Sequence, residues 1–137
     1  MWKLYALLSA LFAGATAVLA KAGMKNVNGN VATAIRTIVI LFLAWGIVLF
    51  AGQMKELKTL TKNNLIFLIL SGIATDLSWI FYFKALETGP VSKIAPIDKL
   101  SLVVAIILAA LFLRESLDWK ALVGGILIVA GTFILIR

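Results

Sequence analysis

The chain has 137 residues, of which 63% are hydrophobic and 14% are charged, and its formal net charge is +7. This composition excludes an ordinary water-soluble domain, in which about 25% of the residues are charged. The absence of cysteine and histidine excludes disulfides, thiol or imidazole catalysis and the commonest transition-metal ligands, so we expect no metal and no cofactor. Because the cations are scattered over short segments, we expect them to face lipid headgroups and not nucleic acid.

Five apolar segments predict five membrane-spanning helices, since a hydrocarbon core of roughly 30 Å requires about 20 apolar residues in a helix. The polar segments between them are short, the longest covering residues 52–62. No ten-residue alternating pattern recurs, which favours helices over a barrel. We therefore expect an all-α protein of the cell membrane with a single transmembrane domain over residues 1–137. Its predicted helices cover residues 4–21, 32–49, 64–86, 91–113 and 119–136.

The first predicted helix follows Lys3 and has the pattern of a secretory signal sequence. Four further apolar segments follow it with no exported domain, so we expect an uncleaved membrane helix. Its alanines and Gly14 lie along one side, and Gly124 and Gly131 lie seven positions apart in the last helix. Small residues at such spacing allow helices to approach closely in lipid, which predicts helix packing at these three glycines.

An acidic residue, Asp76, lies near the centre of the third predicted helix. An uncompensated carboxylate at that depth costs about 2.5–3.5 kcal/mol on insertion scales. Trp79 and Phe83 follow on the same helical face, with Tyr82 beside them. One interpretation is a cavity whose aromatic wall attracts a cationic or amphipathic substrate. The alternative is that Asp76 is a buried structural counter-ion.

Two charged residues, Asp98 and Lys99, follow Pro96 in the fourth predicted helix. Proline lacks a backbone donor and can leave carbonyl groups free. Asp76 and Lys99 have similar depths, so we predict that they form an ion pair and that Asp98 titrates. A titrating carboxylate for which a proton and a substrate compete would couple transport to protons. The alternative is that Lys99 reaches the headgroups while Asp98 pairs locally.

The distribution of positive charge predicts that the chain inserts in both orientations. Six of its 13 Lys and Arg residues fall on the side of the N-terminus and seven on the other side. Such a small difference gives no preferred orientation under the positive-inside rule. The alternative is that Lys55, Lys58 and Lys62 together hold the N-terminus in the cytoplasm.

From about Leu68 onward the pattern resembles the EamA-type repeat of the drug/metabolite transporter superfamily. The resemblance rests on residues 71–74, 82–91 and 113–117 and on two small-residue pairs, residues 124–125 and 130–131. In the looser first half, Arg36 at the head of the second helix occupies a matching place and is expected to serve helix packing. Glu115 matches a glutamate of the repeat and is expected to pair locally with Arg114 or Lys120.

The resemblance implies a half-size secondary transporter of a small metabolite or drug-like solute. Full-length members of that family have two such repeats facing opposite ways, and this chain has one. It departs from the pattern by placing Asp98 and Lys99 in the fourth helix. We expect an antiparallel homodimer in which a second copy completes the cavity between inverted repeats. A non-transporting membrane subunit of a larger complex is the alternative, and neither an enzyme site nor a nucleotide-binding loop is recognisable.

Overall fold

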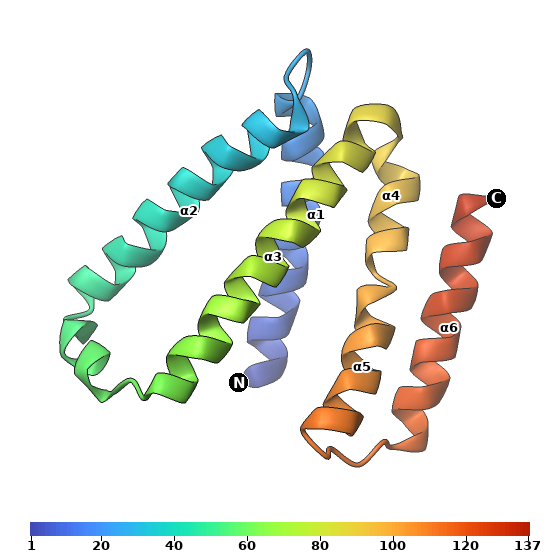
Figure 1. The fold of residues 1–137 in the computed structure, drawn as a ribbon. Helices are drawn as coiled ribbons and strands as arrows, with labels where there is room; N and C mark the ends of the chain where they lie inside the picture. Colours follow the sequence, from blue (N-terminus) through green and yellow to red (C-terminus); the bar gives the residue numbers. More distant parts are fainter. The chain divides into compact units, whose positions relative to one another are not determined.

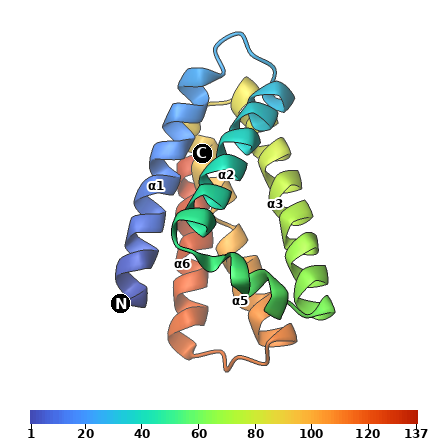
Figure 2. The same cartoon turned by 90° about the vertical axis from the view of Figure 1, so that its left-hand side faces the viewer.

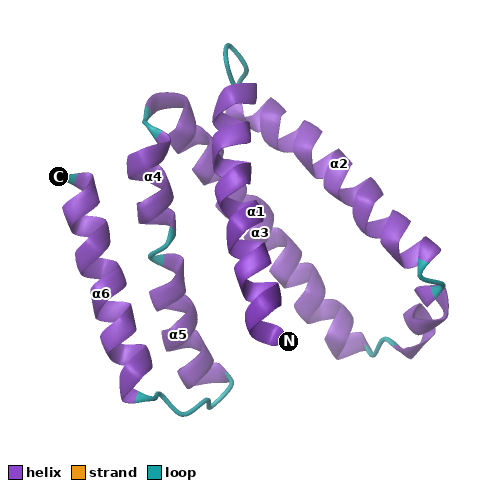
Figure 3. Cartoon of the chain, turned by 180° about the vertical axis from the view of Figure 1, so that it is seen from behind, coloured by secondary structure: helices purple, strands orange, loops and turns teal.

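The computed structural model describes all of residues 1–137 and confirms an all-α chain without strands (Figure 3). Five helical segments are long and apolar enough to cross a membrane, as the apolar runs predict. The elements in chain order are α1 (Trp2–Gly23), α2 (Gly29–Phe50), the 3-10 helix η1 (Gln53–Thr59), α3 (Lys62–Thr88), α4 (Val91–Asp98), α5 (Ser101–Phe112) and α6 (Trp119–Ile136).

The fourth predicted helix is interrupted, and it forms α4 and α5 within one membrane-spanning segment, Val91–Phe112. Pro96 lies inside α4 and cannot donate a backbone hydrogen bond. The chain tightens after it, because the Lys99 N–H donates to the Pro96 carbonyl at 3.1 Å and the Leu100 N–H to the Ile97 carbonyl at 3.0 Å. These bonds span three residues, as in a 3-10 turn. We call residues 99–100 the helix break.

A second difference concerns the loop expected at residues 52–62, which contains η1. Gly52 begins this turn with a φ of 69°, in the left-handed region that glycine adopts without a steric penalty. The 3-10 helix extends over Gln53–Thr59 and has no buried residue. The connection between α2 and α3 is therefore structured rather than irregular.

The chain divides into two compact units, of which the first is Val18–Glu87. Its helices α2 and α3 meet where α2 begins and α3 ends, and they diverge toward η1 (Figures 1 and 2). The Gly29 N–H donates to the Glu87 carboxylate at this junction, and the Lys21 ammonium donates to the Leu86 carbonyl. Leu86 is fully buried. The core of this unit therefore lies at one end of the helix pair.

The second unit comprises Met1–Ala17 and Thr88–Arg137, and in it α6 packs against α4 and α5. The buried residues of α6 are Gly125 and Thr132. A Cβ atom placed on Gly125 would lie 3.9 Å from the Val103 side chain of α5. The Lys93 ammonium of α4 donates to the Ile136 carbonyl at 3.2 Å, where α6 ends.

Within Thr88–Arg137, the residues of α6 that pack are Gly125 and Thr132, and helix packing at Gly14, Gly124 and Gly131 stays a prediction. A Cβ atom at Gly124 or at Gly131 would meet nothing within 4 Å, and the same holds for Gly14 in α1. Adjacent residues of a helix point about 100° apart, so the face built on Gly125 and Thr132 excludes the face built on Gly124 and Gly131.

Most large apolar side chains of the helices are exposed. Phe42 of α2, Phe67 of α3 and Phe133 of α6 are 73%, 73% and 67% exposed. Apolar surface of this extent is unfavourable in water and is expected in contact with lipid or with another protein. The helices are accordingly held together by few buried residues, and the bilayer is their natural solvent.

Candidate functional site

The three aromatic residues predicted to share one side of α3 do gather there, and we call Trp79, Tyr82 and Phe83 the aromatic cluster. The Trp79 ring lies 5.4 Å from the Tyr82 ring in an edge-on arrangement and 5.8 Å from the Phe83 ring. These are favourable aromatic distances. The spacing of three and four residues on one helix brings the rings together without any contribution from tertiary structure.

The residue that faces this cluster is Arg36 of α2, which was expected to serve helix packing. Its guanidinium carbon lies 3.5 Å from the centroid of the Trp79 ring and 6.0 Å from that of Phe83. A cation at this distance over an indole ring is attracted by the negative face of the ring. The face of Trp79 that was predicted to attract a cationic substrate is therefore covered by the chain's own cation.

The other polar groups in this part of the unit have partners of their own. The Thr33 hydroxyl donates to the Gly29 carbonyl at 2.8 Å, and the Thr37 hydroxyl donates to the Thr33 carbonyl at 2.9 Å. The Glu87 carboxylate accepts from the Gly29 backbone. Within Val18–Glu87 no oxygen accepts a hydrogen bond from the Arg36 guanidinium. The Trp79 ring contacts the face of the guanidinium, and the guanidinium N–H groups form no hydrogen bond within this unit.

Asp76 lies one turn before Trp79 on α3, as the sequence predicted, and it is exposed. No cationic side chain of Val18–Glu87 forms an ion pair with it, and its carboxylate accepts no hydrogen bond there. A carboxylate along a membrane-spanning helix requires a partner, a proton or water. The unit therefore contains a cation and an anion on neighbouring helices that do not neutralise one another.

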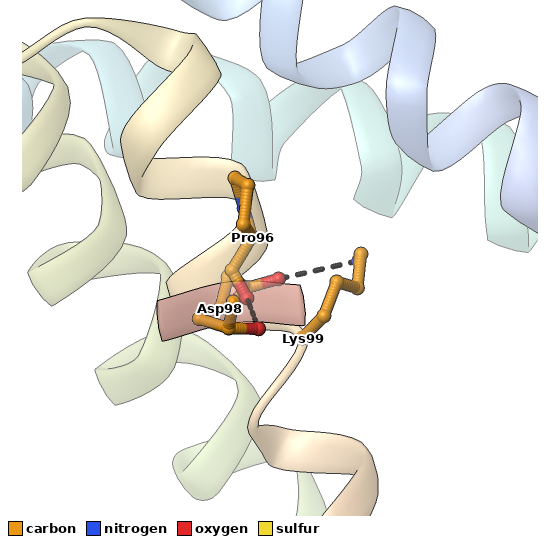
Figure 4. A network of polar contacts seen from close by, with 4 residues as sticks. Pro96, Asp98 and Lys99 are labelled. Atoms are coloured by element: carbon orange, nitrogen blue, oxygen red, sulfur yellow. Dashed lines mark hydrogen bonds and ion pairs between the residues drawn. The ribbon is translucent and has the colours of Figure 1, made fainter. Parts of the chain in front are cut away.

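The helix break carries the second group of charged residues (Figure 4). The Lys99 ammonium lies 3.3 Å from the Asp98 carboxylate, and the two side chains are 51% and 34% exposed. The Thr132 hydroxyl of α6 donates to the Pro96 carbonyl at 3.1 Å. Asp98 thus pairs locally, as the alternative interpretation expected, but its partner is Lys99 itself. Asp76 belongs to the other unit, so its pairing with Lys99 stays a prediction.

Glu115 does not pair with either of its expected neighbours. No ion pair joins it to Arg114 or Lys120, and its backbone N–H donates to the Ala109 carbonyl at 3.3 Å. Arg114 has a φ of 54°, so the chain turns sharply just before Glu115. Glu115 and the adjacent Ser116 lie at the polar rim of a groove of about 450 Å³ that α5 and α6 otherwise line with apolar residues.

Comparison with known proteins gives one consistent result. The model of the EamA-like transporter family matches residues 1–137. A protein of Sinorhizobium sp named "uncharacterized transporter in cobO 3' region" is 44% identical over 134 residues, which cover 98% of this chain and 95% of that protein. No solved structure matches the chain.

Proposed function

Since the chain belongs to the EamA-like transporter family and is a multi-pass integral membrane transporter, we propose that it is a half-size secondary transporter. Two copies in opposite orientations would enclose the pathway for a small metabolite or drug-like solute, with proton coupling at Asp76 or Asp98. Inverted-repeat transporters place their site at the interface of two repeats near the midplane of the bilayer. The five membrane-spanning segments here correspond to one repeat.

The observation that supports this proposal is that Asp76 has no partner within its own unit. Its carboxylate lies along a membrane-spanning helix without a cation or a donor in its own unit. Insertion scales assign such a group a cost of about 2.5–3.5 kcal/mol unless it faces water or a partner. A water-filled cavity shared with a second copy would remove this cost and expose the acid to protons and solute.

Proton coupling is tested by flux into vesicles that contain only the purified protein. We expect an imposed pH gradient to drive solute movement and Asp76→Asn or Asp98→Asn to lower it at least tenfold. Asp118→Asn is the matched control, because this acid precedes α6 and its side chain makes no capping hydrogen bond. Unchanged flux in both membrane variants contradicts the assignment of these acids, and no flux at all favours a non-transporting subunit.

The orientation of the copies is tested by cysteine labelling, which is direct because the chain has no cysteine of its own. Asn26 precedes α2 and Lys58 lies in η1 after it, so one membrane-spanning helix separates them. We expect an impermeant maleimide to label about half of each single variant, Asn26→Cys or Lys58→Cys, from outside. Labelling of one variant alone would show a single orientation and end the antiparallel proposal.

A further inference from the structure

Arg36 is held at a depth where an unmatched cation is costly. It follows Gly29, the first residue of α2, by seven positions, which corresponds to about 10 Å along a helix. Trp79 precedes Thr88, the last residue of α3, by nine positions, or about 13 Å. The contact therefore lies well inside both membrane-spanning segments, and stacking on the ring holds the guanidinium there.

The contact with Trp79 uses only one of the two binding surfaces of a guanidinium. A separation of 3.5 Å from the ring centroid places the guanidinium carbon directly over the indole, within the range of a cation–π contact. Its five N–H donors form a rigid fork at the edge of that plane, which matches a carboxylate or a phosphate. Within Val18–Glu87 this fork has no acceptor, whereas the side chains of Lys21, Thr33, Thr37 and Glu87 are hydrogen-bonded.

The charge of the unit points to a ligand of the opposite sign. Val18–Glu87 carries seven Lys and Arg residues and three Asp and Glu residues. One of those acids, Glu87, is committed to the Gly29 backbone, and Glu56 lies in η1. Asp76 is near in sequence to Trp79 but forms no ion pair with Arg36. The Arg36 guanidinium therefore lies beside the aromatic rings of α3, and no acidic side chain of the unit pairs with it.

We propose that Arg36, stacked on Trp79, binds an anionic oxygen group, a carboxylate or a phosphate, of an amphipathic ligand whose apolar part lies against the aromatic cluster. If the protein is the transporter proposed above, this ligand is its transported solute, and that assignment rests on the proposed function. The same chemistry is offered by a free organic anion and by the headgroup of an anionic lipid. The rings of Tyr82 and Phe83 beside Trp79 supply the apolar wall.

The test uses Trp79 as its own reporter. The chain has four tryptophans, so Trp2→Phe, Trp45→Phe and Trp119→Phe together leave Trp79 alone. This protein is placed in phosphatidylcholine vesicles without any gradient and titrated with benzoate and with inorganic phosphate. We expect a saturable change in Trp79 fluorescence for at least one of them. We expect Arg36→Gln to weaken binding at least tenfold and Arg36→Lys to weaken it several-fold, since lysine keeps the charge but not the fork.

The controls separate the sources of the anion and exclude misfolding. Lys84→Gln removes an exposed cation from α3 and should leave binding unchanged, and helical circular dichroism should be the same in all variants. A saturable, Arg36-dependent change on adding phosphatidylglycerol, without one for the soluble anions, assigns the site to a lipid headgroup. No saturable response to any of these anions, or equal responses in the parent and in folded Arg36→Gln, overturns the inference. Because binding is measured at equilibrium, loss of flux with intact binding contradicts only the proposed transport.

Discussion

Charge is accommodated differently in the two units of the chain. At the helix break in Thr88–Arg137, Asp98 and Lys99 are adjacent and pair with one another. In Val18–Glu87, Arg36 lies over an aromatic ring and Asp76 has no cationic partner from the same unit, so charges of both signs are unmatched within this unit. An ion pair of opposite charges needs no further partner, whereas an unpaired charge in a membrane-spanning segment requires a ligand, water or another charged group. We therefore expect ligand recognition beside the aromatic cluster and not at the helix break.

The largest expected effect comes from the junction that positions Arg36 against Trp79. In Gly29→Leu the new Cβ would lie 2.9 Å from the Glu87 carboxylate and 3.2 Å from the backbone of Phe83. Overpacking costs about 1–3 kcal/mol, and the lost charge-assisted hydrogen bond adds about 1.5–3 kcal/mol. We expect the free energy of unfolding in detergent to fall by roughly 3 kcal/mol.

The matched control for this variant is Gly46→Leu, because Gly46 lies in the same helix and a Cβ there would meet nothing within 4 Å. We expect its unfolding free energy to stay within about 0.5 kcal/mol of the parent, as for substitutions away from packed features. Equal losses in the two variants would show that the junction does not hold α2 to α3. The position of Arg36 over Trp79 would then not depend on this junction, and the contrast drawn between the two units would not be supported.

The next effect concerns the unmatched acid. Asp76→Asn removes a negative charge one turn from Trp79, so an anion at Arg36 is no longer repelled. Two unit charges about 10 Å apart interact by roughly 1.7 kcal/mol at an effective dielectric constant of 20. We expect the affinity for benzoate to rise about tenfold in the fluorescence titration. Glu56→Gln, in the exposed η1, is the control and should change nothing; a weakened affinity in Asp76→Asn would contradict an anion site.

The helices were predictable because the length of an apolar run determines a membrane span regardless of its neighbours. The aromatic cluster was predictable for a similar reason, since residues three and four apart always share a helix face. The contact between Arg36 and Trp79 joins different helices, so no periodicity within one segment reveals it. Its only signal was a lone arginine at the start of an apolar run.

The packing face of α6 and the partner of Lys99 show a second limit. Gly124 and Gly125 are identical in chemistry, and only the rotation of α6 against α5 selects Gly125 for the contact. The sequence located Pro96, Asp98 and Lys99, but it did not show that Thr132 of another helix donates to the Pro96 carbonyl. Contacts between two helices depend on how each helix is rotated about its axis, and the sequence of a single helix does not determine this rotation.

Just before the helix break, the Thr132 hydroxyl of α6 donates a hydrogen bond to the Pro96 carbonyl. Thr132→Val keeps the shape of the side chain and removes its donor, so we expect a loss of about 1 kcal/mol in unfolding free energy. Thr75→Val is the control, because the exposed Thr75 hydroxyl donates only to Ser71 of its own helix. A loss no larger than that of the control would mean that water or lipid replaces the bond.

The smallest expected effect is the coupling energy between Asp98 and Lys99. Its size shows whether this ion pair is exposed to solvent or is buried against a second copy. We expect a double-mutant cycle of Asp98→Asn and Lys99→Gln in detergent to give about 0.2–1 kcal/mol and to weaken with salt, since both side chains are partly exposed. The single variants alone would not suffice, because each leaves an unpaired charge. A salt-insensitive coupling above about 2 kcal/mol would place the pair in a dry environment and remove the contrast with Arg36, because both units would then rely on surroundings that a lone chain does not supply.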